Sequence, residues 1–191
     1  MRIFHGTDVN SAIDILTNGF YDTDRIWEPS VNDTFYAWSA DYVQKFDGDK
    51  DDTEEETKER TISNAIESGQ VKCALGESNH VIVLEFEIDD CYVSPDSSED
   101  NMLESGAAEI SLADMNKHAK LIHIYCSFFP QKLSLFFVPW HNDSIILPNS
   151  LESYREFMTN KRNDFSGIYD SLYEYAYDYR TITEKDLLKL N

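Results

Sequence analysis

Positive charge is scarce in this sequence. Its 191 residues include 16 Lys and Arg against 36 Asp and Glu, which gives a formal net charge of −20. Such a field repels phosphate backbones and anionic membrane surfaces and attracts basic protein surfaces. The balance therefore argues against direct binding of nucleic acid or membrane, and it favours a protein partner with a basic surface.

Cysteine is also scarce. Cys73, Cys91 and Cys126 are far apart in the sequence, and no CxxC motif or His/Cys cluster is present. This pattern excludes a disulfide framework and makes a structural metal site an unexpected feature. The sequence has neither a secretory leader pattern nor an apolar run of 18 residues, so we expect a cytoplasmic protein with reduced thiols. HExxH, GxSxG and P-loop motifs are absent as well.

Aromatic residues, in contrast, are abundant. The chain contains 11 Tyr and 11 Phe, and 41% of its residues are hydrophobic, which is typical of a folded globular protein. Its length predicts one domain over residues 1–148, followed by a helical extension over 149–191 that packs on the same domain. Within the extension, a stripe at helical spacing predicts core contacts: Tyr169, Leu172, Tyr173, Ala176 and Tyr177.

The N-terminal third reads as strand, helix, strand, helix. A short strand is expected over 2–5, and the next helix has Asn10 or Ser11 as its candidate N-cap. Gly19 predicts the end of this helix. A second strand is expected to end near residue 38, where Ser39 has the position of an N-cap for another helix.

The remaining elements are predicted by their composition. The charged run 47–60 reads as a solvated loop leading into a helix that ends near Gly69. Strands are expected over 80–88, 107–112, 120–129 and 132–140, the last two as a hairpin, with a polar loop over 94–101. Helices are expected over 150–162, 165–180 and 183–190. This order predicts an α+β fold with a mostly antiparallel sheet.

Three polar residues of the predicted strands over 80–88 and 120–129 are Glu85, Glu87 and His123. Glu85 and Glu87 share one face of the strand over 80–88, and alternation predicts that both face solvent. His123 alternates within the strand over 120–129, where a half-buried histidine with a structural partner is expected.

The segment "FHGT" followed by a helix that ends in "NGF", then "FYAWSADY", and then a glutamate that opens a later strand resembles the ADP-ribosyltransferase superfamily. The form is that of its His-Tyr-Glu class, which includes poly(ADP-ribose) polymerases and diphtheria toxin. The resemblance covers roughly residues 2–140. It implies a split antiparallel β-sheet core with flanking helices, and NAD as co-substrate without a metal.

The resemblance also implies a role for individual residues. His5 would hydrogen-bond a ribose hydroxyl, Gly6 would let its backbone approach the nicotinamide amide, and Thr7 would support a turn. Ser39 matches the family serine that hydrogen-bonds the nicotinamide carbonyl. Tyr36 and Tyr42 are both candidates for the ring that stacks on nicotinamide, and they lie closer together in this sequence than the two family tyrosines do.

A carboxylate is needed near the ribose, because cleavage of the glycosidic bond builds positive charge there. Glu109 in "GAAEISL" is the candidate, because it follows a small-residue turn and opens a predicted strand. Glu104 is the alternative.

The expected activity is NAD-dependent mono-ADP-ribosyl transfer to a macromolecule, with a basic or nucleic-acid-binding protein as the target. By analogy, small acidic proteins with this fold include toxins, phage effectors and certain anti-CRISPR proteins. The main alternative is a non-catalytic acidic mimic of DNA that uses the run 47–56 to occupy a nucleic-acid-binding protein. RNA 2′-phosphotransferase is a third reading, and it requires a basic groove that so few Lys and Arg do not favour.

Overall fold

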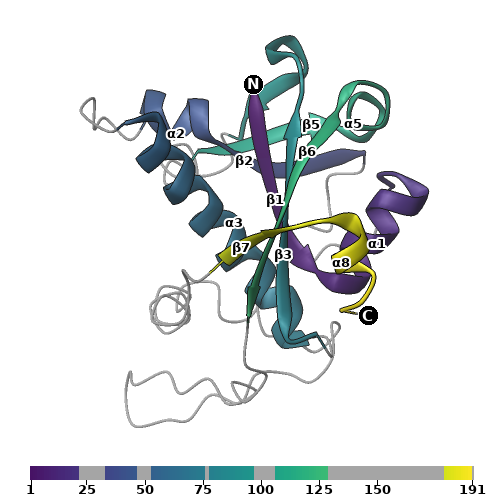
Figure 1. The fold of residues 1–191 in the computed structure, drawn as a ribbon. Helices are drawn as coiled ribbons and strands as arrows, with labels where there is room; N and C mark the ends of the chain where they lie inside the picture. Colours follow the sequence, from purple (N-terminus) through teal and green to yellow (C-terminus); the bar gives the residue numbers. More distant parts are fainter. Residues whose placement is uncertain (22–32, 47–52, 76–77, 97–105, 129–178, 191) are drawn as a thin grey trace, which may run out of the picture.

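A single seven-stranded sheet forms the centre of the molecule (Figure 1). The computed structural model describes residues 1–21, 33–46, 53–75, 78–96, 106–128 and 179–190. The strand order is β4-β5-β2-β1-β3-β6-β7, and every neighbouring pair is antiparallel. The strands are β1 Arg2–Asp8, β2 Thr34–Ser39, β3 His80–Glu87, β4 Val93–Pro95, β5 Ala107–Ser111, β6 Lys120–Phe128 and β7 Tyr179–Ile182.

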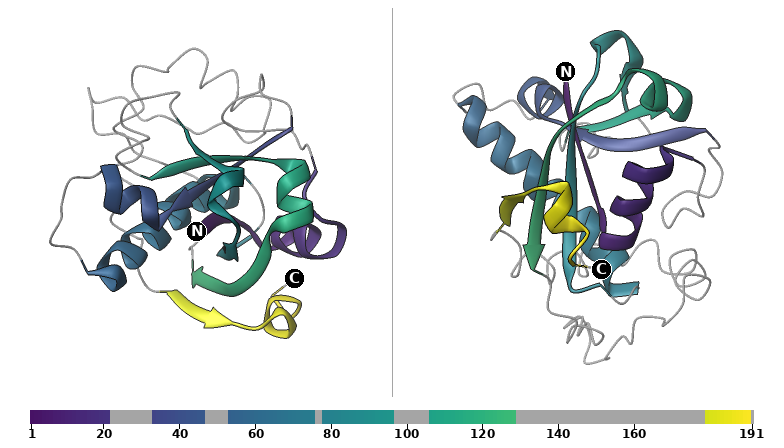
Figure 2. Two further views of the ribbon diagram at one scale, coloured as in Figure 1. Left: turned by 90° about the horizontal axis from the view of Figure 1, so that it is seen from above. Right: turned by 45° about the vertical axis from the view of Figure 1, so that its right-hand side comes forward.

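Helices lie against both faces of this sheet (Figure 2). The long helix α3 (Glu54–Leu75) covers one face and crosses the central strand β1. On the opposite face, α1 (Val9–Asn18), α5 (Leu112–His118) and α8 (Glu184–Leu187) contribute to one apolar core. The short helices α2 (Ala40–Phe46) and η1 (Asp90–Tyr92) follow β2 and precede β4. The expected α+β class with an antiparallel sheet is therefore confirmed.

The core on the α1 side of the sheet is built by alternate strand residues. Ile3 of β1, Phe35 and Ala37 of β2, and Leu84 of β3 lie in it, all nearly or fully buried. Because side chains alternate between the two faces of a strand, the residues between them point toward the α3 side. Among the described residues, no helix is both long and apolar enough to cross a membrane.

Strand β1 is longer than its sequence predicts. All seven of its residues pair with β3, from Arg2 opposite Glu87 to Asp8 opposite Val81. His5, Gly6 and Thr7 therefore lie inside the strand, and the prediction that the strand ends at His5 and turns there is wrong. The strand continues because β3 offers a paired neighbour along its full length.

The ends of helix α1 are held by side chains. Asp8, rather than Asn10 or Ser11, is the N-cap: its carboxylate accepts hydrogen bonds from the Ser11 N–H at 3.0 Å and the Ser11 hydroxyl at 2.8 Å. Gly19 ends the helix with a φ of 82°, as expected from the sequence.

Phe20 follows this helix end and packs on the core. Its ring lies edge-on to Phe35 and to Phe86, with centroids 4.8 and 5.3 Å away. The side chain of Asn116 in α5 clamps the Phe20 backbone: its Oδ1 accepts from the N–H at 2.8 Å and its Nδ2 donates to the carbonyl at 2.6 Å. Phe20 therefore fixes the end of α1 against the core and against α5.

Helix α3 approaches the backbone of β1 very closely. A Cβ on Gly6 would lie 1.5 Å from the Ala65 carbonyl oxygen, and a Cβ on Gly69 would lie 2.9 Å from the Thr7 backbone nitrogen. Glycine at both positions is what allows this contact. The helix also begins at Glu54, so the second half of the charged run 47–60 is helical rather than a loop.

Several elements differ from the sequence-based expectations. The strand expected over 107–112 is shorter by one residue, because helix α5 begins at Leu112 directly after β5. This helix was not expected, although Ser111 caps it by accepting from the Asp114 N–H at 3.0 Å. Ser94 and Pro95 belong to β4 rather than to a loop. Tyr179 and Arg180, expected at the end of the helix over 165–180, instead belong to β7, which pairs with β6. Helix α8 confirms the start of the last predicted helix. The predicted strand 132–140, the helix over 150–162 and the tyrosine-containing stripe lie outside the described residues.

Candidate functional site

Glu85 is a fully buried carboxylate on the α3 side of the sheet. Its side chain is 0% exposed, although it lies in the middle of β3 between apolar residues. A charged group is rarely buried without partners, because removing it from water costs several kcal/mol. The expectation that Glu85 faces solvent is therefore wrong, whereas Glu87, two residues later, is exposed as expected.

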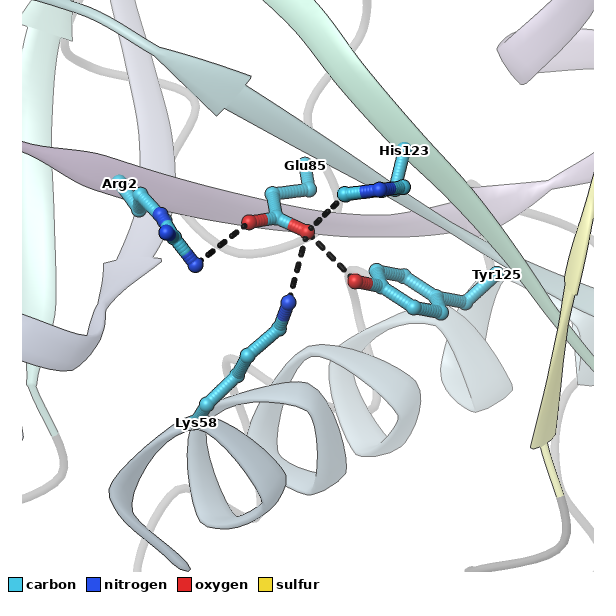
Figure 3. Close-up of polar contacts among 5 residues, drawn as sticks. All are labelled: Arg2, Lys58, Glu85, His123 and Tyr125. Atoms are coloured by element: carbon cyan, nitrogen blue, oxygen red, sulfur yellow. Dashed lines mark hydrogen bonds and ion pairs between the residues drawn. The ribbon is translucent and has the colours of Figure 1, made fainter. Parts of the chain in front are cut away.

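Four side chains from three further elements surround this carboxylate (Figure 3). Oε2 accepts hydrogen bonds from the Tyr125 hydroxyl at 2.5 Å and from His123 Nδ1 at 2.9 Å, both on β6. Lys58 Nζ of α3 lies 3.3 Å from the same oxygen. Arg2 Nη1 of β1 lies 3.6 Å from Oε1. The contacts connect β1, β3, β6 and α3.

These contacts determine the ionisation of the pair formed by Glu85 and Tyr125. Burial alone would raise the pKa of Glu85, but the hydrogen bonds from Tyr125 and His123 and the charge of Lys58 outweigh it and hold the pKa below its ordinary value. Burial and the adjacent carboxylate raise the pKa of Tyr125. Glu85 is therefore ionised near neutral pH, and the Tyr125 hydroxyl is a donor to it.

We expect this network to make stability depend on pH. A carboxylate whose pKa is lower in the folded state stabilises the fold above its unfolded pKa of about 4.3, and this contribution disappears as pH falls through the folded pKa. Glu85→Gln is expected to lower the free energy of unfolding at pH 7 by roughly 1.5–3 kcal/mol, the scale of hydrogen bonds to a charged group. Urea unfolding of both proteins at a series of pH values measures the difference.

The difference between the two proteins should narrow between pH 5 and pH 3 as the carboxylate of the parent is protonated. Glu87→Gln is the matched control, since this side chain is exposed on the same strand, and its effect should be small at every pH. A difference for Glu85→Gln that does not change with pH would mean that the charge of Glu85 contributes nothing to stability.

The sequence contains a signal for this cluster that alternation alone does not reveal. In the register of β3 against β6, the polar residue Glu85 lies opposite the polar residue His123, and the apolar residue Leu84 lies opposite the apolar residue Ile124. An acidic residue inside an otherwise apolar strand, with histidine and tyrosine two residues apart on another strand, is a pattern in which the polar groups can pair. Only the register of β3 against β6 decides that they do.

His5, Tyr36 and Glu109 come from three neighbouring strands in the order β1, β2, β5. The His5 Nδ1 lies 3.0 Å from the Tyr36 carbonyl oxygen, so Nδ1 carries the proton of this bond. Tyr36 lies directly opposite Glu109 in the register of β2 and β5. All three side chains are partly exposed.

The side chains of this group lie on two faces of the sheet. The His5 ring contacts Phe35 with centroids 4.5 Å apart, on the face of the apolar core. Tyr36 and Glu109 alternate with core residues and therefore point to the α3 side. The described ladder between β1 and β2 contains only the pairs Ile3–Ser39 and Phe4–Trp38. The Tyr36 carbonyl lies just beyond the end of this ladder, where the His5 side chain binds it.

Structural contacts account for the other residues of the predicted site. Gly6 lies under the Ala65 carbonyl of α3, and Thr7 is fully buried inside β1 rather than at a turn. Ser39 is also fully buried, and its hydroxyl accepts from the Tyr42 N–H at 3.4 Å, consistent with the expected N-cap.

Tyr42, one of the two candidates for stacking on nicotinamide, packs in the apolar core. Its side chain is 8% exposed, and its hydroxyl donates to the Val93 carbonyl at 3.1 Å. Burial, together with the charges of Asp90 and Asp41, raises the pKa of this hydroxyl. Tyr36 is the more exposed of the two tyrosines. Glu104 lies outside the described residues.

Comparison with known proteins adds no assignment to this geometry. No family model matches the chain, and neither the curated proteins nor the solved structures contain a significant match. Among the described residues, no group of three or more His, Cys, Asp or Glu side chains is placed to hold a metal ion.

Proposed function

We propose that the protein is an NAD-dependent ADP-ribosyltransferase that modifies a macromolecular target. The observation that carries the proposal is the arrangement at the end of the β1–β2 ladder, where the His5 ring binds the Tyr36 carbonyl and Tyr36 lies opposite Glu109. Residues that are far apart in the sequence, and that match the His, Tyr and Glu of the family, are thus brought to three adjacent strands.

The buried residues narrow the proposed site. Since Ser39 and Tyr42 are almost inaccessible, we assign NAD binding to His5 and Tyr36, with Tyr36 as the stacking ring. The Tyr36 carbonyl fixes the proton of a neutral His5 on Nδ1, which makes Nε2 an acceptor suited to a ribose hydroxyl. His5 and Glu109 approach the end of the β1–β2 ladder from opposite faces of the sheet.

The proposed reaction replaces one bond at the ribose. The bond between C1′ and the nicotinamide nitrogen breaks, and nicotinamide leaves with the bonding electrons. A nucleophile of the target then forms a bond to C1′ and loses its proton. Positive charge develops on the ribose in between, and the carboxylate of Glu109 is the group proposed to stabilise it.

The proposed target is a protein with a basic surface. Helix α3 exposes four glutamates near its N-terminus, Glu54, Glu55, Glu56 and Glu59, in a chain with a net charge of −20. Charges of one sign accelerate association with a surface of the opposite sign and discriminate against other partners. The acidic residues 47–52 that precede them lie outside the described residues.

Nicotinamide release and NAD binding test this proposal. The folded protein should release nicotinamide from NAD, and His5→Ala should weaken NAD binding by about tenfold, the scale of one lost hydrogen bond. Calorimetric titration measures the affinity, and a melting curve shows whether the variant is folded. His118→Ala is the control, because His118 stacks on Tyr92 and is not part of the proposed site. Unchanged affinity in a folded His5→Ala variant would count decisively against it.

The exposed glutamates of α3 also favour a second function. A non-catalytic acidic mimic of DNA would need an extended negative surface and no NAD site. The two functions differ in one measurement: a mimic inhibits a nucleic-acid-binding protein without NAD and releases no nicotinamide. Intact-mass measurement of candidate targets after incubation with NAD separates them, because only transfer adds the mass of ADP-ribose.

A further inference from the structure

The cluster around Glu85 carries more positive charge than it needs to neutralise its carboxylate. Arg2 and Lys58 are two permanent cations beside one buried anion, and His123 is a third nitrogen base in contact with it. Within the described part of the chain, neither Arg2 nor Lys58 forms an ion pair with another acidic side chain. In a protein with a net charge of −20, such a local excess of positive charge is unusual.

The geometry of Arg2 shows that its donors are not committed to Glu85. Its Nη1 lies 3.6 Å from Oε1, beyond hydrogen-bond range, and Oε1 is a buried oxygen that accepts no hydrogen bond within the described residues. The guanidinium has five N–H donors, and its side chain is 51% exposed. It therefore lies at the surface with its fork available to a second acceptor.

Lys58 and His123, the other two basic side chains, are held in place by the Glu85 carboxylate. Lys58 is anchored by Glu85 and lies 5.6 Å from the centre of the Tyr125 ring, while His123 is fixed through Nδ1 and remains 46% exposed. All three basic groups thus lie within 3.6 Å of the same carboxylate. Because the buried Glu85 carboxylate holds these basic side chains close together, they are preorganised to bind a compact anion.

Nearby acidic residues limit the class of ligand. Glu87 lies exposed on the same face, opposite Arg2 in the register, and Glu55 and Glu59 act on Tyr179 at the adjoining end of α3. These glutamates would repel a long polyanion. A single tetrahedral anion is small enough to contact Arg2, Lys58 and His123 without lying beside the glutamates. A phosphate ester has several acceptor oxygens, which suits the fork of arginine and the point charge of lysine.

We propose that Arg2, Lys58 and His123 form a binding site for the phosphate group of a small phosphate ester, with Glu85 as the residue that positions them. The site is separate from the proposed NAD site, since it uses none of His5, Tyr36 or Glu109. It can therefore be tested without NAD and without any transferase activity.

NMR titration of the full chain with inorganic phosphate, ribose 5-phosphate and ribose tests the site. Phosphate and ribose 5-phosphate should produce saturable shifts at Arg2 and at the His123 ring, and ribose should not. Tighter binding of ribose 5-phosphate than of inorganic phosphate would identify an ester as the ligand, whereas equal binding would identify free phosphate. The absence of saturable shifts with both, up to about 10 mM, would overturn the proposal.

Three variants of the cluster and one control make the test specific. Arg2→Gln should weaken phosphate binding by about tenfold, and Arg2→Lys, which keeps the charge but loses the fork, should also weaken it measurably. Lys58→Gln repeats the test on a separate element, and Lys117→Gln in α5 is the control for the loss of one exposed positive charge. Titrations at constant ionic strength, with melting curves for each variant, separate binding from folding. Equal binding in Arg2→Gln, Lys58→Gln and Lys117→Gln would show that the cluster is only a structural ion-pair network.

Discussion

A Gly6→Ala variant is expected to lose about 3 kcal/mol of its free energy of unfolding, the upper end of the cost of overpacking a core. The added methyl group would lie 1.5 Å from the carbonyl oxygen of Ala65. This obstacle is backbone, so no side-chain rotation relieves it, and helix α3 has to move away from the central strand. Chemical unfolding of the variant measures the loss.

The control for this variant is a substitution of an exposed strand residue. Ser94→Ala in β4 changes an exposed residue and should alter stability by less than about 0.5 kcal/mol. A Gly6→Ala protein with the stability of the parent would contradict the close packing of α3. If that protein also bound NAD poorly, Gly6 would have the role that the family resemblance implies.

Glu109→Gln is expected to lower the rate of nicotinamide release by about 10²-fold or more, the scale of losing one preorganised electrostatic group. The substitution keeps the size and shape of the side chain and removes its charge. NAD affinity should stay within a few-fold, because the charge on the ribose develops in the transition state and not in bound NAD. Turnover and calorimetric binding of the same preparation measure the two effects separately.

Two further glutamates serve as comparisons. Glu87→Gln removes an exposed carboxylate elsewhere in the sheet and should leave turnover unchanged. Glu104→Gln tests the alternative carboxylate. Near-normal turnover in Glu109→Gln together with a large loss in Glu104→Gln would move the catalytic role to Glu104. If the parent protein releases no nicotinamide at all, the acidic mimic becomes the leading function.

Local patterns predicted the elements whose formation depends on nearby residues. The β-branched run at 80–88 formed β3, and Gly19 ended α1 as its conformational freedom predicts. The N-cap of α1 differs from the prediction, because the helix begins directly after β1 and the last strand residue, Asp8, caps it instead of Asn10 or Ser11. Residues 107–111 formed β5, but helix α5 after it has only seven residues, too few for a clear helical period.

Long-range contacts account for the rest. The length of β1 depends on its pairing with β3, more than 70 residues away, so no local signal places His5 inside the strand. In the sequence, Gly6 is simply a glycine next to a histidine. Only the path of α3 shows that this position has no room for a Cβ. Glu85 reads as a solvent-facing residue until β6 supplies His123 and Tyr125 as partners.

The central position of β1 also affects when the protein can fold during synthesis. Its residues leave the ribosome before those of β3, yet Asp8 pairs with Val81 and Arg2 with Glu87, so one edge of the strand has no partner until β3 has been made. At the usual speed of translation this wait is roughly 4 to 15 s. Throughout that time the apolar residues Ile3 and Phe4, fully buried in the finished protein, stay exposed on the nascent chain and are potential binding sites for chaperones.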